Sequence, residues 1–432
     1  MLGKENLINK QILIYGLGLS GKSCHKYLSK NNNIKIFDDN SSFRKNKNKD
    51  YFINKKQINH IRFDYIVISP GIDIKQCGLK DYLLKNRKKI ITELDIFCTA
   101  YPENIKITIT GTNGKSTTCK MLHKIFKSKN LDVRLVGNIG NPPLLEKNIK
   151  KKTIFIVEAS SYQISYSNYL KTDYAVILNL SADHLERHGS INEYAKAKLK
   201  LIYNQDKNKQ SYIERNNNII NRNILYQNIK SKINKLNFKK ENFFRKKISN
   251  LYLLDKNNLN NIHFVYKISK IFKISDYIIF KSLNLFKGLK FRKQIVIDKP
   301  KLKIINDSKS TSFSSTNELL STYNNIYWIV GGMFKKEDKF VLKKKYHKNI
   351  KAYIIGLNKK IFINQLKDKI QFKYVKNLKK AISNIKNDIK KDPNVKTILF
   401  SPAAASFDQF KNFEHRGNYF NSLIKKNNFN GK

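Results

Sequence analysis

The chain has 432 residues, 41% hydrophobic and 12% aromatic, which is enough to fill packed cores and excludes long disorder. A single core rarely serves more than about 250–300 residues, so the length predicts about three domains. The formal net charge of +53 raises nucleic acid as a partner, but no recognisable nucleic-acid-binding motif accompanies it. Lys, Asn and Ile also recur in featureless stretches such as residues 216–235, as in products of A+T-rich coding sequences. The charge is therefore interpreted as lying on solvated faces.

The cysteines and the N-terminal segment bear on the compartment. Cys24, Cys77, Cys98 and Cys119 form neither a CxxC pair nor a Cys/His metal pattern, which favours a reducing environment. The apolar stretch at 11–16 is much shorter than a signal-peptide core, and no later run approaches the roughly 18 apolar residues needed to cross a bilayer. We expect a soluble, cytoplasmic protein.

The first third of the chain alternates apolar strands with a helix. Short β-rich runs at 12–16, 34–37 and 65–69 predict buried strands, and residues 20–30 predict a helix between the first two. This βαβ order predicts a parallel sheet with right-handed crossovers.

Two further α/β series follow. The second has a predicted helix at 115–128 and predicted strands at 105–110, 153–158 and 174–180. The third has predicted strands at 302–307, 326–332, 352–356 and 397–402. Residues 206–260 are rich in Lys and Asn without a clear period, and no structure is predicted there.

The fold class predicted from these series is α/β in three domains. We expect residues 1–97 to form a Rossmann-like parallel sheet and 289–432 a Rossmann-like C-terminal domain. Residues 98–288 are expected to form a central domain of the P-loop ATPase type, on the evidence of the glycine loop described next.

The strongest local motif is ITITGTNGKSTTCKML at 107–122, where a strand enters a glycine loop and continues as a helix. Backbone N–H groups of such a loop surround phosphate oxygens, Lys115 reaches the β- and γ-phosphates, and Ser116 or Thr117 can hold Mg²⁺. Only two residues separate Gly111 from Gly114, fewer than in the common GxxxxGK[ST] loop. The competing interpretation is a glycine turn that precedes Lys-Ser by chance.

A second glycine loop follows the first strand. Gly16, Gly18 and Gly21 complete GxGxxG, and Asp38 follows the next strand at the spacing of a ribose-binding acid. Taken alone, this motif fits a nicotinamide dehydrogenase and a tight βα turn equally well.

Several ordered segments together resemble the Mur ligases, and the phosphate loop is also similar to that of the related folylpolyglutamate synthetases. The segments are GLGLSG (16–21), ISPGI (68–72), VGNIGNP (136–142), VEASSYQI (157–164), SADHLERHG (181–189), INDSKSTSFSST (305–316), IVGGMFKKEDKF (329–340) and LFSPAAASFDQFKNFEHRGNYF (399–420). The last one resembles most the branch of the family that adds D-glutamate.

The resemblance implies a site for each substrate. It implies ATP binding by Gly111, Thr112, Asn113, Gly114, Lys115, Ser116, Thr117, Asn258, Asn261, Arg292, Asp307 and Lys309. It implies contacts to the UDP-linked substrate by Leu19, Ser20, Asp38, Asn138 and Ser160. It implies D-glutamate binding by Thr311, Lys335, Ser406, Phe407 and Phe413. The chain departs from the family at Asp39 and Asn40, where a Thr-Arg type pair is usual, and at Asn257 and Phe291, where histidines are usual.

The resemblance also implies two Mg²⁺ ions held by Ser116, Glu158, His184 and Lys198, with Lys198 carbamylated, and catalytic roles for Lys115, Lys198 and His184. Without it, His184 would be interpreted as a structural histidine, and Lys198 as part of a solvated basic helix face with Lys196 and Lys200.

The implied activity is an ATP-dependent amide ligase that adds D-glutamate to UDP-N-acetylmuramoyl-L-alanine through an acyl phosphate, as a monomer that requires neither nucleic acid nor membrane. Two alternatives remain. One is another Mur ligase or a folylpolyglutamate synthetase, which differs in the amino acid that releases phosphate from ATP. The other is an RNA-binding protein built on an inactivated ligase, which would bind RNA in a salt-sensitive way without ATPase activity.

Overall fold

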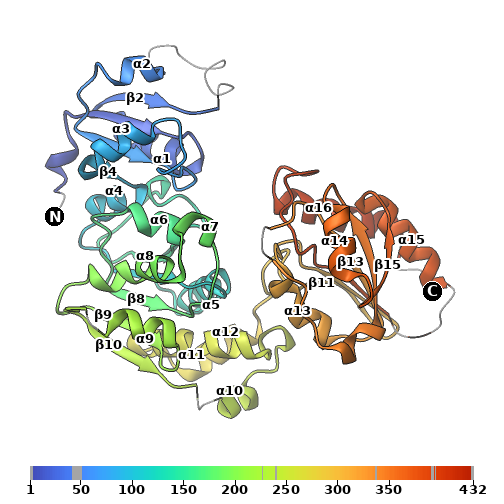
Figure 1. Ribbon diagram of the computed structural model, residues 1–432. Coiled ribbons are helices and arrows are strands. Elements are labelled where there is room, and N and C mark those ends of the chain that lie inside the picture. The colour runs from blue at the N-terminus through green and yellow to red at the C-terminus, as the bar shows by residue number, and fades with distance from the viewer. Residues whose placement is uncertain are drawn as a thin grey trace. The chain divides into compact units, whose positions relative to one another are not determined.

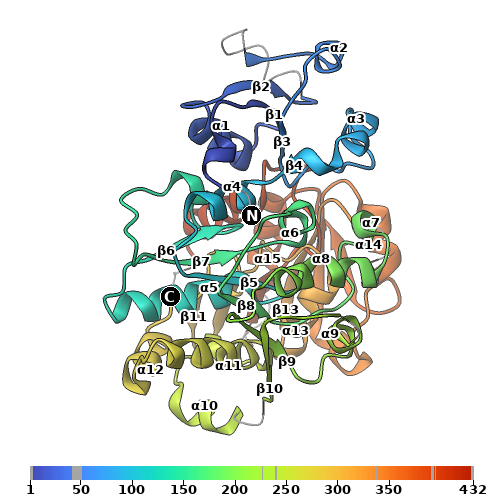
Figure 2. The ribbon, with the colours of Figure 1, turned by 90° about the vertical axis from the view of Figure 1, so that its left-hand side faces the viewer.

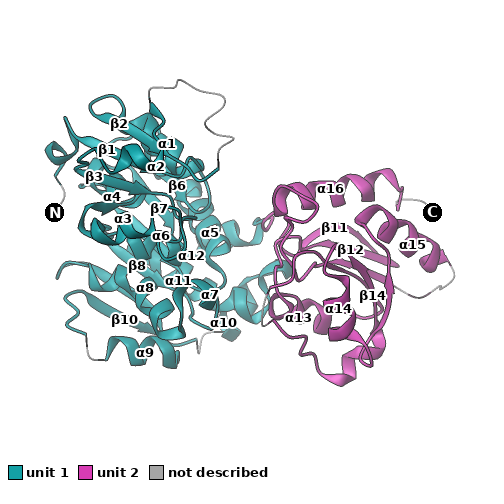
Figure 3. Ribbon diagram, turned by 45° about the horizontal axis from the view of Figure 1, so that its top comes forward, with its two compact units in different colours: residues 1–286 teal, residues 287–432 magenta. Residues whose placement is uncertain are grey.

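The computed structural model describes residues 3–40, 51–225, 227–238, 241–335, 338–390, 394 and 396–429. The chain divides into two compact units, residues 1–286 and 287–432 (Figure 3). Three sheets are present in the described residues, two in the first unit and one in the second. The predicted α/β fold class is therefore confirmed, while the domain boundaries at 97 and 288 stay predictions.

The first sheet has the order β2-β1-β3-β4, and all its strand pairs are parallel. Its strands are β1 (Gln11–Tyr15), β2 (Asn33–Phe37), β3 (Tyr65–Ile68) and β4 (Ile90–Ile91). The helices of this region are α1 (Leu19–Leu28), α2 (Lys55–Ile58), α3 (Lys80–Lys85) and α4 (Glu93–Ala100), with short 3₁₀ turns η1 (Glu5–Leu7) and η4 (Arg87–Lys89). The three strands predicted from short apolar runs are confirmed. The central strands β1 and β3 are almost fully buried, which accounts for their continuous apolar runs, while the edge strand β2 is partly exposed at Asn33 and Lys35.

The second sheet is also fully parallel, in the order β10-β9-β8-β5-β7-β6. Its strands are β5 (Lys106–Thr110), β6 (Val133–Gly137), β7 (Ile154–Glu158), β8 (Tyr174–Ile177), β9 (Gln210–Glu214) and β10 (Lys232–Leu236). The helices are α5 (Lys115–Ser128), α6 (Ser161–Tyr166), α7 (Leu185–His188), α8 (Ile191–Tyr203), α9 (Asn218–Ile224), α10 (Glu241–Lys247), α11 (Lys256–Ile271) and α12 (Asp276–Asn284), with turns η5 (Pro143–Leu145) and η6 (Leu251–Leu253). In Figures 1 and 2 the first sheet lies at one end of this unit, and α4 lies where the two sheets meet.

The region left unassigned by the sequence is ordered where the structure describes it. It supplies β9, α9, β10 and α10 at one edge of the second sheet. Both strands are short, and β10 is an edge strand whose residues stay partly exposed, so Lys and Asn alternate with few apolar residues. That composition hides the strand period.

The second unit contains a mixed sheet in the order β11-β12-β16-β13-β14-β15, in which only the β11–β12 pair is antiparallel. Its strands are β11 (Gln294–Lys299), β12 (Leu302–Asn306), β13 (Ile326–Gly331), β14 (Ile350–Ile355), β15 (Gln371–Tyr374) and β16 (Lys396–Phe400). The helices are α13 (Phe313–Thr322), α14 (Lys359–Leu366), α15 (Leu378–Lys390) and α16 (Phe413–Lys426), with the turn η7 (Lys344–Asn349). The four predicted strands of this region are confirmed.

Each sheet has a switch point in its strand order, where successive connections leave to opposite sides. Ligands of open α/β sheets bind beyond the carboxyl ends of the strands at such points. The relevant loops are those that follow β1 and β3 in the first sheet, β5 and β8 in the second, and β12, β13 and β16 in the third.

All four cysteines are free thiols. Within the described residues, none of the helices combines the length and apolar character required to cross a membrane.

Candidate active site

The phosphate loop joins β5 to α5 with the geometry expected of an anion cradle. Gly111 and Gly114 both have positive φ, 154° and 85°, where a side chain is strained. A Cβ on Gly114 would lie 2.6 Å from the amide atoms of Asn261 in α11. The loop therefore needs glycine at both positions, and α5 begins directly behind it with its N-terminal N–H groups.

A second segment, which follows β8, holds this loop in place. Asn179 accepts from the Asn113 N–H through Oδ1 at 2.9 Å and donates through Nδ2 to the Asn113 carbonyl at 3.2 Å. Its own carbonyl accepts from the Thr112 N–H at 3.0 Å, and the Ser181 N–H donates to the Thr112 hydroxyl at 3.1 Å. Sequence reasoning missed Asn179, whose only signal is an asparagine at the carboxyl end of a strand next to the phosphate loop.

Lys115 and Lys198 converge on the loop from two helices. Lys115 Nζ donates to the carbonyls of Gly111 and Thr112, both at 2.8 Å. Lys198 Nζ donates to the Gly111 carbonyl at 2.9 Å and lies 4.8 Å from the centre of the Tyr194 ring. Both candidate catalytic lysines are thus brought to the same loop.

Lys198 is buried, with 2% of its surface exposed, so it does not belong to a solvated basic face. Burial, and secondarily the charge of Lys115, hold the pKa of Lys198 well below its usual value. Lys196 on the same helix is exposed and pairs with Glu193 at 2.9 Å. The structure thus separates the two lysines that the sequence pattern groups together.

Glu158 ends β7 with a carboxylate that is 1% exposed. Its Oε1 accepts from Asn138 Nδ2 at 2.8 Å, whereas Oε2 is buried without a hydrogen-bond partner among the described residues. A buried carboxylate oxygen without a partner is costly unless a proton or a cation satisfies it. Ser116, also buried, stands in the first turn of α5.

His184 has a left-handed backbone, with φ of 55°, at the start of α7. Its Nδ1 lies 2.8 Å from the Tyr162 hydroxyl, and its Nε2 lies 3.5 Å from an Asp183 carboxylate oxygen. The described residues include no group of three or more His, Cys, Asp or Glu side chains placed to hold a metal ion. A metal at this edge would therefore need hydroxyl, carbamate or substrate oxygens as well.

The glycine loop after β1 is shaped by Asp38. The Asp38 carboxylate accepts from the N–H groups of Leu17 at 2.7 Å and Asn40 at 2.9 Å. Asp39, at a position where the chain departs from the family, accepts from the Tyr15 hydroxyl at 2.6 Å. Leu19 is exposed at the start of α1 and Ser20 is half-buried beside it.

Ser160 caps α6 in a capping box with Gln163, so its hydroxyl already has a local partner. The two asparagines of α11 differ in their surroundings. Asn258 donates to the Tyr252 carbonyl at 2.8 Å and to Asp255 at 2.7 Å, whereas the Asn261 amide lies against the phosphate loop at Gly114. The structure thus places Asn261, and not Asn258, directly against that loop.

The nucleotide candidates of the second unit surround the carboxyl end of β12. Asp307 accepts from the Lys293 N–H at 3.0 Å and from the Ser401 hydroxyl at 2.9 Å, and burial raises its pKa to about 6. Arg292 is half-buried, and its charge lowers the Asp307 pKa. Lys309 Nζ lies 4.0 Å from the centre of the Phe413 ring, which brings a nucleotide candidate and a D-glutamate candidate together.

The D-glutamate candidates follow three neighbouring strands, β12, β16 and β13. Thr311 and Phe407 are exposed, Phe407 to 69%, while Lys335 and Phe413 are half-buried and Ser406 is buried. Backbone bonds between Met333 and Ala405, at 3.0 and 2.9 Å, tie the loop after β13 to the loop after β16.

Arg416 ties the same loops together, and sequence reasoning gave it no role. It is 1% exposed and donates to the carbonyls of Ser308 at 2.7 Å and Ala404 at 2.9 Å, and through Nε to the Ser308 hydroxyl at 3.1 Å. Burial lowers its pKa to about 10. The sequence signal is the arginine inside NFEHRG, but nothing local shows that its side chain turns inward.

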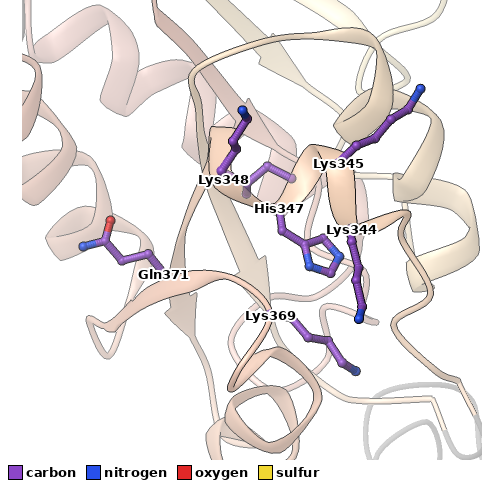
Figure 4. Close-up of a pocket in the computed structure, with 7 residues that line it drawn as sticks. Lys344, Lys345, His347, Lys348, Lys369 and Gln371 are labelled. Carbon is purple, nitrogen blue, oxygen red and sulfur yellow. The ribbon is translucent and has the colours of Figure 1, made fainter.

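A lysine-lined hollow of about 630 Å³ lies elsewhere in the second unit (Figure 4). It is lined by Lys344, Lys345, His347, Lys348, Ile350, Lys369 and Gln371. Ile350 and Gln371 begin β14 and β15, so the hollow lies at the amino ends of the strands. None of the candidate site residues lines it.

Comparison with known proteins identifies relatives of this chain. Residues 109–315 match the family model described as the Mur ligase middle domain. The UDP-N-acetylmuramoylalanine--D-glutamate ligase of Rickettsia bellii (strain RML369-C) is 32% identical over 95% of this chain and 96% of its own length. The enzyme of that name from Buchnera aphidicola subsp. Acyrthosiphon pisum (strain Tuc7) is 35% identical over 98% of this chain and 99% of its own length.

Two solved structures share the fold at low identity. UDP-N-acetylmuramate-alanine ligase MurC from Thermotoga maritima superposes with a TM-score of 0.56 at 15% identity, over 97% of this chain and 100% of that one. MurF ligase from Thermotoga maritima in complex with ADP superposes with a TM-score of 0.55 at 14% identity, over 99% of this chain and 98% of that one. At such identities these structures bear on the fold alone. With relatives above 30% identity along almost its whole length and an α/β fold built on three sheets, the chain belongs to the Mur ligase family.

Proposed function

We propose that this ligase joins D-glutamate to UDP-N-acetylmuramoyl-L-alanine at the expense of ATP. Mur ligases are ATP-dependent enzymes that form amide bonds. The observation that carries the proposal lies at the carboxyl ends of the strands of the second sheet. A phosphate loop, two lysines and a buried carboxylate converge there. The names of the relatives support D-glutamate as the added amino acid.

The reaction has two steps in which bonds are exchanged. A carboxylate oxygen of the alanine attacks the γ-phosphorus of ATP, giving an acyl phosphate and ADP. The amine of D-glutamate then attacks the acyl carbon, a C–N bond forms, the C–O bond to phosphate breaks, and phosphate and a proton leave. Phosphoryl transfer needs mainly positioning and charge neutralisation.

We assign the neutralising role to Lys115. In the structure its ammonium is bonded to the carbonyls of its own loop. A phosphate in the loop offers a charge-assisted bond, which is stronger than a bond to a neutral carbonyl. Gly111, Thr112, Asn113, Gly114, Ser116 and Thr117 complete the proposed cradle, and we assign nucleotide contacts to Asn258, Asn261, Arg292, Asp307 and Lys309.

The residues at the carboxyl ends of these strands fit Mg²⁺. The orphaned Oε2 of Glu158 is a hard anionic oxygen, the ligand type that Mg²⁺ prefers. Ser116, Glu158, His184 and a carbamate on Lys198 would hold the ion, and we propose two ions by family resemblance. When bound, Mg²⁺ withdraws charge from phosphoryl oxygens.

We propose that Lys198 carries a carbamate. Its neutral amine nitrogen attacks CO₂, a C–N bond forms, and one proton is released. The reaction requires the unprotonated amine, which burial and the neighbouring Lys115 favour. The product turns a repelled cation into an oxygen ligand for Mg²⁺.

We assign the remaining contacts by substrate. Leu19, Ser20, Asp38, Asn138 and Ser160 serve the UDP-linked substrate, with Asp38 acting through the loop that it orders. Thr311, Lys335, Ser406, Phe407 and Phe413 receive D-glutamate, whose two carboxylates need a cation and hydroxyl donors. We place the enzyme in the cytoplasm, acting as a monomer.

A phosphate-release assay tests the proposal. With ATP, Mg²⁺ and UDP-N-acetylmuramoyl-L-alanine, D-glutamate should release phosphate while L-glutamate and L-alanine do not. Phosphate release with another amino acid would instead assign another Mur ligase activity to the chain. Salt-sensitive RNA binding without any phosphate release would favour the inactivated RNA-binding alternative, and loss of that binding in a Lys344, Lys345 and Lys348 triple alanine variant would map it to the lysine-lined hollow.

A further inference from the structure

Arg187, the third residue of α7, connects the two sheets of the first unit. Its guanidinium donates to the carbonyl of Gly71 at 3.1 Å, to that of Pro70 at 3.0 Å, and to that of Ile72. Its Nε lies 4.0 Å from a carboxylate oxygen of Asp73. One side chain therefore engages every residue of the turn that follows β3, which we call the 70–73 turn.

The same guanidinium packs on two tyrosines of α6. It lies 4.5 Å from the centre of the Tyr162 ring and 5.6 Å from that of Tyr166. The Tyr166 hydroxyl accepts from Arg187 and from the Ile74 N–H, both at 3.3 Å. The arginine side chain is only 12% exposed, so these contacts are shielded from solvent and are stronger than surface contacts of the same kind.

The contacts to the 70–73 turn fix the direction of its peptide groups. In a planar trans peptide the N–H points away from the C=O. With the carbonyls of Pro70 and Ile72 turned toward Arg187, the N–H groups of Gly71 and Asp73 face the opposite side. Neither N–H donates to another group among the described residues. The turn thus presents free donors on the side away from the arginine.

The turn also borders the other loop at this switch point. The Ser69 hydroxyl donates to the Gly16 carbonyl at 2.7 Å, which joins the 70–73 turn to the glycine loop after β1. Both loops follow the carboxyl ends of adjacent strands, where ligands of such sheets bind.

Arg187 is also connected to His184, through Tyr162. The Tyr162 ring receives the guanidinium on its face, and its hydroxyl bonds His184 Nδ1 at 2.8 Å. His184 lies three residues before Arg187 and starts the same short helix. Arg187 thus contacts both the 70–73 turn and the tyrosine that bonds His184.

We propose that Arg187 is a positioning residue that holds the 70–73 turn in register with α6 and α7, so that the N–H groups of the turn face the nucleotide part of the UDP-linked substrate. The inference rests on the proposed function for the identity of that substrate. Lysine cannot replace arginine here, because a single ammonium cannot span three carbonyls and a carboxylate while stacking on two rings.

The test compares Arg187→Lys with Arg245→Lys, a matched control whose arginine forms an exposed pair with Glu241 on α10. Arg187→Lys should raise the KM for UDP-N-acetylmuramoyl-L-alanine by about tenfold or more and leave the KM for ATP within about twofold. It should also speed amide hydrogen exchange in residues 69–74 without substrate. Arg245→Lys should change none of these values.

Two results would overturn the inference. One is unchanged exchange in residues 69–74 of a folded Arg187→Lys protein. The other is an equal rise in all three KM values, which would indicate general loosening of the fold. If Arg187→Lys fails to fold, Tyr166→Phe provides the test, because it removes one hydroxyl of the same cluster. This variant should raise the KM for the UDP-linked substrate selectively, by about twofold to fivefold. An unchanged KM for that substrate would reject the inference.

Calorimetric binding of UDP-N-acetylmuramoyl-L-alanine to the full chain separates this inference from the proposed function. A wild-type protein that binds this compound but releases no phosphate would overturn the proposed function, and weaker binding by Arg187→Lys than by Arg245→Lys would still support the role of Arg187. A wild-type protein that does not bind it would overturn both.

Discussion

Lys115 and Lys198 donate to the same atom, the carbonyl oxygen of Gly111, at 2.8 and 2.9 Å. Two ammonium groups at one oxygen repel each other, and the more deeply buried Lys198 has its pKa lowered by burial first and by Lys115 second. The arrangement favours a neutral Lys198 and leaves Lys115 as the cation of the phosphate loop.

Replacing Lys115 by alanine should reduce turnover by about two to three orders of magnitude, because the charge that neutralises the transferred phosphoryl group is lost. Thermal stability should stay close to wild type. Lys127→Ala, on the exposed end of the same helix, serves as the control and should leave turnover unchanged. Near-normal turnover in a folded Lys115→Ala protein would reject the phosphate-loop assignment.

Replacing Lys198 by alanine should abolish most activity and leave a cavity beside the phosphate loop. Millimolar acetate or formate should restore part of the turnover by supplying the missing carboxylate oxygens. Lys196→Ala should be nearly normal without additive, because Lys196 points to solvent on the same helix. Full activity of Lys198→Ala without additive would show that the buried lysine is not needed for catalysis.

Replacing Lys335 by alanine should raise the KM for D-glutamate by about tenfold and spare the KM for ATP, since one charge-assisted contact to a substrate carboxylate is removed. Steady-state kinetics with each substrate varied in turn provides the measurement, and Lys343→Ala, on the exposed chain nearby, is the control. A raised KM for ATP with an unchanged KM for D-glutamate would assign Lys335 to the nucleotide.

Asn179→Ala should raise the KM for ATP by about tenfold, because both side-chain bonds to Asn113 are lost and the phosphate loop is less ordered before binding. The backbone bond from Thr112 to residue 179 remains, so the melting temperature should change little. An unchanged KM for ATP would show that the loop is held without this side chain.

Asp95 makes stability depend on pH. It is fully buried at the start of α4, and burial raises its pKa to about 6 from the ordinary value of 3.8. Because the folded state binds the proton more tightly than the unfolded chain does, this contribution is fully present below about pH 4 and is lost as pH rises through 6. The free energy of unfolding of wild type minus that of Asp95→Asn should therefore fall, on the order of 3 kcal/mol, from pH 4 to pH 7. Urea titrations at both pH values measure it, and a constant difference would contradict the prediction.

Local sequence predicted much of the fold, because strands buried on both faces leave continuous apolar runs. Ile12–Ile14, Ile107–Ile109 and Ile329–Val330 lie in such runs and are fully buried. β10 was missed for the opposite reason, since it is a partly exposed edge strand whose Lys and Asn residues carry no clear period. β9 is an internal strand, but its buried run is short and contains only two apolar residues, Tyr212 and Ile213.

The phosphate loop was recognisable for an equally local reason. Gly111, Gly114 and Lys115 are neighbours in the chain, and the left-handed φ values at the two glycines depend on residue type more than on distant packing. The roles assigned to the substrate residues came instead from resemblance to a family and remain proposals.

The sequence by itself determined the central apolar strands, the helix at 115–128 and the phosphate loop, because backbone preferences and apolar periodicity act over a few residues. Only the tertiary structure decided that Lys198 is buried while Lys196 is solvated, and that Asn179 holds the phosphate loop. It also decided that Arg187 joins the 70–73 turn to α6, and that Arg416 joins the loops after β12 and β16. These facts depend on strand order and helix rotation, which bring together residues tens to more than a hundred positions apart, and at such separations the chemical type of a lysine or arginine does not reveal which carbonyls surround it.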